Sequence, residues 1–287
     1  MTEEKKIKSV SIVGVGLIGG SFALALRAAG FNGEITGVSS PPAIEAGIAT
    51  GAIARGVSLE EAAATADVLY LAQPVSQILQ TIKKLCSLAK NDCLITDAGS
   101  AKSEIARQAA ECLSPSVFLG GHPMAGKEQR GAEAADANLF RGRPYVLCPT
   151  GAERSPFEKD FRAWLAMIGA DVLDMSPEAH DSTVALTSHL PQLLSTALAE
   201  TLAKSGNPHL TKVFGPGLID MTRLALSSPD LWLSILTTNK VPVATALDEF
   251  IEVLTGIRDT LDTEDLRTHF RIASEYSSKL RKLSFTN

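Results

Sequence analysis

The sequence predicts an α/β protein with a Rossmann-type, doubly wound, mostly parallel sheet, followed by an all-helical C-terminal part. Three observations predict this class. Short β-branched runs alternate with helical patterns through the first half of the chain. A G-x-G-x-x-G motif follows the first of these runs. After about residue 176 the strand signal fades, and stretches rich in Leu, Ala, Thr and Ser take over.

The alternation of strands and helices in the first half requires crossover connections. These connections predict a mostly parallel sheet that is covered by helices on both faces. Ser58 and Glu61 form a capping box that opens one helix, and Gly30 stands where the first helix should end. Strands are predicted at residues 10–13, 34–38, 67–72, 93–96, 117–119, 145–148 and 171–173, and helices at 18–29, from about 58, at 75–89, 102–113 and 157–167.

The chain has 287 residues, which suggests two domains. We expect a dinucleotide-binding domain over 1–175 and a helical domain over 176–287, in which 263–283 is still helical. No low-complexity linker separates them, so they are expected to pack directly.

Composition narrows the class of protein further. The chain is 45% hydrophobic and carries a net charge of −5, so it lacks the positive field of a nucleic-acid-binding protein. No apolar run reaches the length of a membrane span, and the charged start does not resemble a signal peptide. The four cysteines are scattered without a C-x-x-C pair, so we expect neither a disulfide framework nor a zinc site, but four small core residues in a cytoplasmic protein. We find no convincing metal-ligand cluster.

The glycine motif predicts a dinucleotide site. Gly14 permits the tight turn, Gly16 lets the backbone approach a pyrophosphate, and Gly19 lets the helix pack on the strand. The intervening Leu17 and Ile18 open the helix, whose N-terminal N–H groups attract the anion. The alternative is an ordinary Gly-rich turn between a strand and a helix.

The end of the second predicted strand bears on the choice of cofactor. An NAD enzyme usually carries an acid there for the ribose 2′-hydroxyl, whereas this chain has Ser39 and Ser40. Nothing there repels a 2′-phosphate, and the two hydroxyls could bond to one, although no Arg follows. We therefore favour NADP over NAD.

Polar residues follow three later strands, at the sheet edge where such folds bind ligands. Gln73 and Pro74 are assigned to the cofactor. His122, which follows two glycines, is predicted to be a general base. Ser100 either caps the next helix or touches ligand, or does both, and Asp97 either braces its loop or takes part in catalysis.

These segments give the chain its resemblance to the prephenate/arogenate dehydrogenase family of tyrosine biosynthesis. The resemblance covers nearly the full length, and the HPMAG and SHLP segments are more specific than the glycine motif. It rests on GVGLIGGS (14–21), DAGSAK (97–102), GHPMAGKE (121–128), SHLP (188–191), DMTR (220–223), SPDLW (228–232) and the asparagine at 239. The segment 213–219 departs from the Gly-rich pattern expected before DMTR.

The resemblance implies oxidative decarboxylation of a cyclohexadienyl substrate, prephenate or arogenate, with hydride transfer to NAD(P). It makes His122 the base and places Ser100 on the substrate hydroxyl, near the nicotinamide. It also implies a homodimer formed through the helical domain, where Trp232 is either a core residue or part of the partner's site.

The remaining roles that the resemblance implies concern substrate binding. Arg223 would clamp the ring carboxylate with its planar fork, oriented by Asp220 one turn earlier. His189 would contact substrate at the domain cleft, and Glu128 would contact the substrate side chain or help close the site. The alternatives are a surface ion pair for Arg223 and a helix cap for His189.

Two rival functions remain open from the residues alone. A β-hydroxyacid dehydrogenase shares this domain order but uses a catalytic Lys, and neither Lys204 nor Lys212 lies in a matching motif. A non-catalytic NADP-binding sensor would leave the placement of His122 and Arg223 unexplained. The positive balance at residues 127–130 favours prephenate over arogenate. The other histidines, at 180, 209 and 269, are expected to be structural or exposed.

Overall fold

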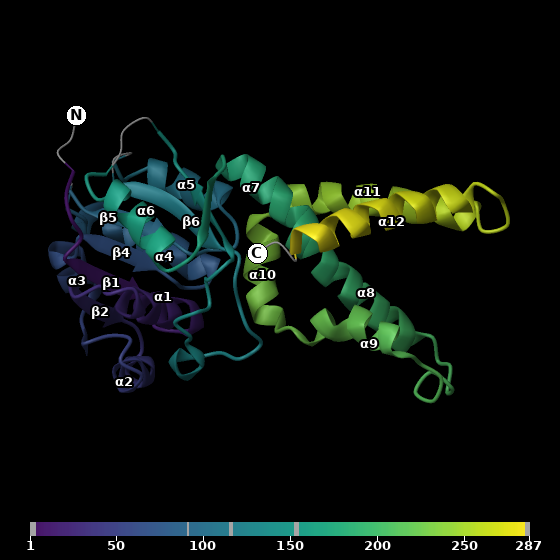
Figure 1. Ribbon diagram of the computed structural model, residues 1–287, viewed down its shortest axis with the longest axis horizontal. Coiled ribbons are helices and arrows are strands. Elements are labelled where there is room, and N and C mark those ends of the chain that lie inside the picture. Colours follow the sequence, from purple (N-terminus) through teal and green to yellow (C-terminus); the bar gives the residue numbers. More distant parts are fainter. Residues whose placement is uncertain (1–3, 91, 115–116, 152–154, 285–287) are drawn as a thin grey trace.

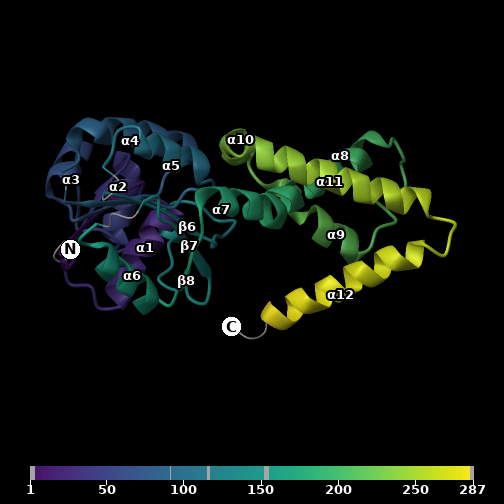
Figure 2. The same ribbon diagram turned by 90° about the horizontal axis from the view of Figure 1, so that it is seen from above.

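A computed structural model describes residues 4–90, 92–114, 117–151 and 155–284. The chain forms a sheet-containing part and a helical part, which lie side by side along the longest axis of the molecule (Figure 1). Figure 2 shows the helical part extending away from the sheet as an elongated arm. Among the residues described, no helix combines the length and apolarity that a bilayer crossing requires.

Within the described residues, eight strands form one sheet in the order β3-β2-β1-β4-β5-β6-β7-β8. The neighbouring strands pair in parallel except for β6 and β7, which are antiparallel. The predicted doubly wound, mostly parallel sheet is therefore confirmed. The strands are β1 (Ser9–Val13), β2 (Glu34–Val38), β3 (Arg55–Gly56), β4 (Val68–Leu71), β5 (Leu94–Asp97), β6 (Phe118–Pro123), β7 (Pro144–Cys148) and β8 (Asp171–Asp174).

Helices connect the strands and cover the sheet (Figure 1). Two local predictions about them are confirmed: the Ser58 side chain accepts a hydrogen bond from the Glu61 N–H at 3.1 Å, and Gly30 ends the first helix with a φ of 93°. The helices are α1 (Leu17–Ala28), α2 (Pro41–Ala49), α3 (Leu59–Thr65), α4 (Val75–Leu88), α5 (Ser103–Ala110) and α6 (Glu158–Met167).

The helical part begins directly after β8, with no intervening linker. Its last helix confirms the prediction that the chain is still helical beyond residue 263. Its helices are α7 (Pro177–Val184), α8 (Leu190–Lys204), α9 (Pro216–Thr222), α10 (Pro229–Thr238), α11 (Lys240–Asp259) and α12 (Leu266–Ser284), with a π turn at Ala185–His189 and a 3₁₀ turn at Arg223–Leu226.

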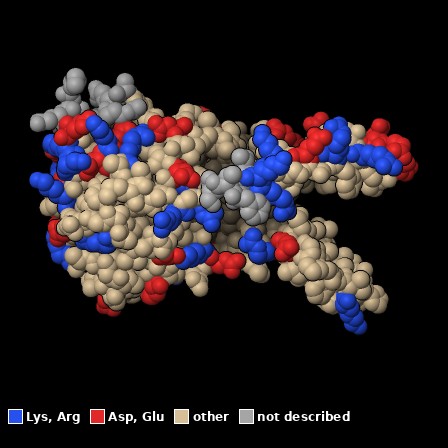
Figure 3. Space-filling model, in the orientation of Figure 1, with Lys and Arg blue, Asp and Glu red and all other residues tan. Residues whose placement is uncertain are grey.

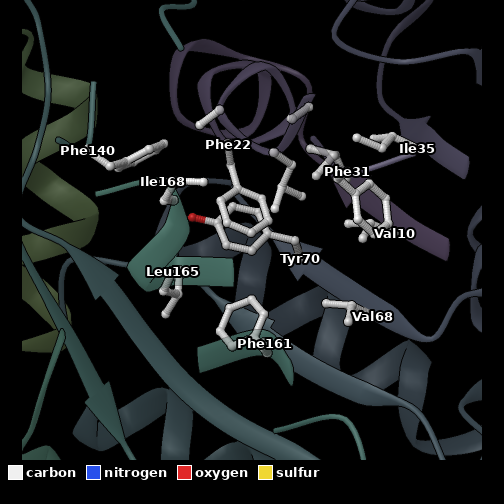
Figure 4. Packing of buried hydrophobic residues seen from close by; sticks show 14 of the residues in the cluster. Val10, Phe22, Phe31, Ile35, Val68, Tyr70, Phe140, Phe161, Leu165 and Ile168 are labelled. Atoms are coloured by element: carbon white, nitrogen blue, oxygen red, sulfur yellow. The ribbon is translucent and has the colours of Figure 1, made fainter. Parts of the chain in front are cut away.

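The main core lies between the sheet and the helices α1 and α6. Phe22 on α1 stacks on Tyr70 of β4 with ring centroids 4.0 Å apart, and Phe161 of α6 packs against the same ring of Phe22 (Figure 4). A second cluster of buried residues covers the opposite face beneath α3, α4 and α5. Each fully buried aliphatic or aromatic side chain contributes about 1.5–3 kcal/mol, so these two layers hold the sheet rigidly beneath the site.

The helical part has a much smaller core. Its buried apolar cluster consists of Ala185, Val243 and Ala246, with a few half-buried leucines around it. Figure 2 shows α12 diverging from the helices before it. Ile272, Tyr276 and Leu280, which follow one another at four-residue spacing on α12, are all exposed.

The prediction that all four cysteines are core residues is wrong for two of them. Cys86 on α4 and Cys112 just after α5 form a disulfide, with Cα atoms 5.3 Å apart. The two helices pack against each other, which a separation of 26 residues does not disclose from spacing. Cys93 and Cys148 are buried free thiols as predicted, and burial raises the pKa of Cys93 to about 11 and that of Cys148 to about 12.

Two short elements were not predicted. Strand β3 has only two residues, both exposed, so it carries no alternating pattern. Helix α2 begins with two prolines, which suit the first turn of a helix but are more often read as a loop.

Candidate active site

A cleft of about 700 Å³ opens at the carboxyl ends of the parallel strands, between the sheet and the helical part. This is the edge at which doubly wound sheets bind ligands. Both parts of the chain line it. The lining residues with polar or charged side chains are Gln73, Ser100, Lys127, Glu128, Gln129, Arg130, Arg223, Ser227, Ser228, Asp230 and Ser234.

The glycine turn reaches this cleft through Leu17 and Ile18, which line it. Gly14 has a φ of 100°, and a Cβ at this position would lie 2.6 Å from the Ala72 carbonyl oxygen. A Cβ on Gly19 would lie 2.2 Å from the Gly14 carbonyl oxygen, so helix and strand pack at the distance that only glycine allows. At Gly16, by contrast, a Cβ would meet no atom within 4 Å. The backbone at Gly16 therefore faces open space, as the approach of a ligand requires.

The start of α1 adds donors to the same space. Gly16 is its N-cap residue, and no side chain bonds to the cap. Leu17 and Ile18, in its first turn, line the cleft. The first N–H groups of a helix have no partner within the helix and attract anions.

Two other predicted cofactor segments lie around this turn. Gln73 and Pro74, between β4 and α4, line the cleft. The Thr81 hydroxyl donates a hydrogen bond to the Gln73 Oε1 atom at 2.8 Å and so fixes that side chain. Ser39 and Ser40, after β2, are exposed; Ser40 is the N-cap of α2 but makes no side-chain cap bond there.

The loop from β5 to α5 is braced by a buried ion pair. Asp97 is fully buried; it accepts hydrogen bonds from the Gly99 N–H at 2.8 Å and the Gly121 N–H at 3.1 Å, and it pairs with the Lys102 ammonium group. Lys102 also donates to the Gly121 carbonyl at 2.7 Å. The bracing role of Asp97 is therefore the one that the geometry supports. The brace fixes the residue next to His122.

Ser100 lines the cleft from this loop. It is not the N-cap of the following helix, because α5 begins at Ser103 with Lys102 at the cap position. The cap comes from a distant residue instead. The carboxylate of Asp181 accepts hydrogen bonds from the Lys102 N–H at 2.7 Å and the Ser103 N–H at 2.8 Å. Ser100 is thus free of the capping role that the sequence allowed.

His122 lies on β6 and is half-buried. Its Nδ1 atom is 2.8 Å from Nε2 of His180, which lies on α7 and is fully buried. The Nδ1 atom of His180 is in turn 2.8 Å from a carboxylate oxygen of Asp181. His180 was expected to be merely structural or exposed, and Asp181 was not singled out. Neither residue carries a signal in the local sequence, because both belong to a helix that lies 58 residues beyond His122.

The surroundings of His122 keep it neutral. Burial lowers the pKa of His122 well below its ordinary value of 6.5, and electrostatic interaction with the basic groups of His180, Lys102 and His189 lowers it further. A neutral imidazole has one nitrogen that can accept a proton. His122 therefore meets the chemical requirement for a base at pH 7.

His189 is positioned by a π turn. Pro191 has no N–H to donate to the carbonyl one turn earlier, and the helix widens into a π turn over Ala185–His189 just before it. His189 occupies the N-cap position of α8, but its backbone is helical and its side chain makes no cap hydrogen bond, so the helical segment is continuous there. Its ring is buried, lies against Trp232 with centroids 5.8 Å apart, and accepts a hydrogen bond from the Asn239 amide at 3.2 Å.

Asn239 fixes the protonation of His189. Its Nδ2 group also donates to the Asp181 carbonyl at 2.9 Å, which identifies this atom as the nitrogen of the amide. Since Nδ1 of His189 accepts, its ring hydrogen is on Nε2. Burial lowers the pKa of His189 to about 4, so it is a neutral donor at pH 7.

Arg223 and Glu128 face each other across the cleft. Both line it, and a guanidinium nitrogen of Arg223 lies 3.8 Å from a carboxylate oxygen of Glu128. The two side chains are largely exposed, which leaves the guanidinium accessible to an anion. The Arg223 N–H donates to the Asp220 carbonyl at the end of α9. Among the described side chains, however, no hydrogen bond or ion pair joins the Asp220 carboxylate to the Arg223 guanidinium, and Asp220 is exposed.

The structure thus brings seven of the fifteen predicted site residues into the lining of one cleft. His122 and His189 do not line the cleft but adjoin it through neighbouring residues, whereas Asp220 and the serines after β2 stand outside its lining. Those that line it are Leu17, Ile18, Gln73, Pro74, Ser100, Glu128 and Arg223. No group of three or more His, Cys, Asp or Glu side chains suited to a metal ion occurs in the ranges that the structure describes.

The fold and the cleft define a class of protein. A strand–glycine turn–helix unit with an open backbone at Gly16, at the carboxyl edge of a doubly wound sheet, fits the pyrophosphate of a nicotinamide dinucleotide. The accessible guanidinium of Arg223 lines the same cleft. The neutral histidine His122 lies on β6 of the same sheet, outside the lining. These features define a dinucleotide-dependent oxidoreductase of the Rossmann type with a helical second part.

Comparison with known proteins identifies the family. Models described as prephenate dehydrogenase, nucleotide-binding domain, and prephenate dehydrogenase, dimerization domain, match residues 22–173 and 176–274. The chain belongs to the prephenate dehydrogenase family, which confirms the predicted resemblance. It is an oxidoreductase that binds a nicotinamide dinucleotide, and the family's oxidative decarboxylation in tyrosine biosynthesis is its function.

Individual relatives agree with this assignment. The chain is 33% identical to prephenate dehydrogenase of Bacillus subtilis, over 95% of this chain and 76% of that protein. It is similar to a crystal structure of Aquifex aeolicus prephenate dehydrogenase in complex with hydroxyphenyl propionate and NAD⁺, with 32% identity, a TM-score of 0.88, and coverage of 99% and 100%. Synechocystis arogenate dehydrogenase matches with 27% identity, a TM-score of 0.81, and coverage of 96% and 99%. These matches do not favour the β-hydroxyacid dehydrogenase or the non-catalytic sensor.

Proposed function

We propose that this chain oxidatively decarboxylates prephenate in preference to arogenate, and that it uses NADP in preference to NAD. The observation that carries the proposal is the shared cleft of about 700 Å³, which is lined by Leu17 and Ile18 of the glycine motif together with Ser100 and Arg223.

Each step of the proposed reaction is assigned to a particular group. When bound, the nicotinamide ring accepts the hydride that leaves the substrate carbon bearing the 4-hydroxyl group. His122 takes the hydroxyl proton, and the Ser100 hydroxyl holds the same oxygen. The resulting ketone accepts the electron pair of the breaking C–C bond as carbon dioxide leaves, and the ring becomes aromatic.

Binding and orientation of the substrate fall to residues on the opposite wall. Arg223 clamps the ring carboxylate, for which its planar, always charged guanidinium is suited. Asp220 is assigned to the orientation of Arg223 when substrate is bound. His189 is assigned to the substrate through the N–H at its Nε2; in this structure its ring is 1% exposed and does not line the cleft. Glu128 lines the cleft, where it can contact the substrate side chain or close the cleft over it.

The preference for prephenate rests on charge. The two substrates differ in a pyruvyl or an alanyl side chain, and only the second carries an ammonium group. Lys127 and Arg130 line the cleft. Glu128, the acid between them, lies opposite Arg223 at 3.8 Å. Arg223 and Asp230 line the cleft as well, and Lys127 also pairs with Asp136 at 2.6 Å, so three cationic and two acidic side chains line it in all. The resulting positive charge of the lining disfavours an added positive charge on the substrate.

The preference for NADP rests on the end of β2. Ser39 and Ser40 are exposed there, and neither position carries an acid that would repel a 2′-phosphate. Ser40 makes no side-chain cap bond to α2, so its hydroxyl can bond to the phosphate.

The direct test measures kcat/KM for prephenate and arogenate, each with NADP and with NAD. We expect the highest value for prephenate with NADP. A higher value with arogenate overturns the substrate preference, and a higher value with NAD overturns the cofactor preference.

A variant isolates the cofactor preference. Ser39→Asp places a carboxylate where the 2′-phosphate would lie, so it should raise KM for NADP at least about tenfold while KM for NAD holds or falls. Ser87→Asp adds the same charge on the exposed face of α4 and should change neither. Equal effects of Ser39→Asp on both cofactors would contradict the assignment.

We also propose that residues 176–287 act as the substrate-binding and dimerisation domain, that two copies form a homodimer through it, and that the enzyme is cytoplasmic. The dimer is supported by the small core of this part and by its exposed apolar residues, such as Phe214, Leu233, Phe270 and Tyr276. On the face drawn in Figure 3, few charged side chains cover α8 and α9. Light scattering should give twice the mass of the chain, and a monomer would contradict the proposal.

A further inference from the structure

The site contains a hydrogen-bonded chain of three side chains, of which only the first is assigned a role above. It runs from His122 on β6 through His180 to Asp181 on α7, with both contacts at 2.8 Å. His180 and Asp181 are 0% and 2% exposed. Neither can reach the substrate directly, so any effect they have on the reaction passes through His122.

The hydrogen-bond partners of Asp181 determine its charge state. Burial alone would raise the pKa of Asp181, but the hydrogen bonds from His180 and from the Ser103 and Lys102 N–H groups outweigh it and lower the pKa. Asp181 is therefore ionised and can only accept hydrogen bonds. Its contact with His180 then requires the hydrogen of that ring to be on Nδ1.

The same argument determines the tautomer of His122, the proposed base. With a single ring hydrogen, on Nδ1, His180 has a lone pair on Nε2, and this atom faces Nδ1 of His122. His122 must donate there, so its own hydrogen is on Nδ1. Its Nε2 atom is then left as an acceptor.

We infer that Asp181 and His180 are positioning residues that set the tautomer of His122, so that its Nε2 atom is unprotonated and ready to take the substrate's hydroxyl proton. This inference rests on the proposed role of His122 as the base. It assigns a role in the reaction to two buried residues that the substrate does not touch.

The three hydrogen-bonded side chains also accommodate the positive charge that forms when His122 takes up the hydroxyl proton. When the hydroxyl proton arrives at Nε2 of His122, the ring donates its Nδ1 hydrogen to His180. Transfer of that hydrogen places the positive charge on His180, next to the Asp181 carboxylate, and leaves His122 neutral. Two protons have then moved: the hydroxyl proton to Nε2 of His122, and the Nδ1 hydrogen of His122 to Nε2 of His180. His122 is left with its hydrogen on Nε2. The alternative, a cation confined to His122, would face Lys102 and His189 without a carboxylate of its own.

The test reads the tautomers directly. Long-range ¹H–¹⁵N correlation spectra of the full chain labelled with ¹⁵N-histidine distinguish a ring hydrogen on Nδ1 from one on Nε2. The chain has five histidines, so single substitutions assign the signals. We expect His122 to carry its hydrogen on Nδ1 in the protein without substrate. A hydrogen on Nε2 overturns the inference.

Two variants connect the tautomer to the rate. Asp181→Asn can present an amide N–H to His180, which reverses both tautomers and should lower kcat at least about 100-fold, as expected when a general base is lost. His180→Phe keeps the cap that Asp181 provides for α5 but leaves His122 without its acceptor, and should lower kcat at least about tenfold. Glu178→Gln, on the exposed face of the same helix, is the matched control and should change neither tautomer nor rate.

The outcomes separate the inference from the proposed function. An unchanged His122 tautomer in Asp181→Asn, or an unchanged kcat in His180→Phe, overturns the inference even if the enzyme turns over prephenate as proposed. The spectra of the free protein do not depend on any substrate. If Asp181→Asn does not fold, His180→Phe and the wild-type spectrum still decide the question.

Discussion

Replacing Lys102 with methionine tests the buried brace beneath the site. Methionine has a similar length, but it removes the ammonium group that pairs with Asp97 and donates to the Gly121 carbonyl. The carboxylate keeps only its two backbone donors, at 2.8 and 3.1 Å, and is 0% exposed. Breaking one side of a buried ion pair costs about 3–5 kcal/mol. At this chain length the loss corresponds to a fall of roughly 6–20 °C in Tm.

The assay is urea unfolding followed by circular dichroism, at a fixed protein concentration because a dimer would couple stability to concentration. Arg107→Met is the control: Arg107 pairs with Glu104 and Glu111 on the exposed face of α5, where such pairs contribute about 1 kcal/mol or less. Combining Lys102→Met with Asp97→Asn should recover part of the loss, since no unpaired charge remains. A loss for Lys102→Met no larger than that for Arg107→Met would refute the reasoning.

Two further predictions concern single residues of the cleft. Arg223→Ala should raise KM for prephenate at least about 30-fold, or about 2 kcal/mol of lost binding, with a smaller change in kcat; a KM within threefold of wild type would contradict the carboxylate clamp. Burial holds the pKa of His189 at about 4 in the folded chain against 6.5 when unfolded, so between these values the unfolded chain binds more protons and stability falls as the pH falls. From pH 7.5 to pH 5 this residue alone should cost about 2 kcal/mol, and urea unfolding of His189→Gln should show that much less pH dependence; equal slopes would show that His189 is not held neutral.

The dinucleotide half was predictable because its signals are local. Gly14 and Gly19 are needed by contacts within one strand–turn–helix unit, and the capping bond from Ser58 lies within four residues of chain. Hydrophobic periodicity located the strands for the same reason. Motifs of this kind can be interpreted without the tertiary fold, because the residues that contact one another lie close together in the sequence.

The unpredicted features depend on contacts between distant segments. Asp181 caps α5 although it lies 79 residues away in the sequence. Ser100 is therefore not the N-cap of α5, although the local sequence allowed that role. His180 is a site residue only because α7 packs beside β6. The pairing of Cys86 with Cys112 likewise follows from two packed helices. No spacing rule discloses such partners, because the tertiary fold and not the local chain brings them together.

The most direct test of the whole account is the turnover of His122→Asn with prephenate and NADP, measured with the dissociation constant of NADP by fluorescence titration. Asparagine cannot take up the hydroxyl proton, but it leaves the glycine turn and the cleft unchanged. We predict that kcat falls at least about 100-fold while the dissociation constant stays within threefold. Near-normal turnover would contradict the central claim that the imidazole on β6 is the base.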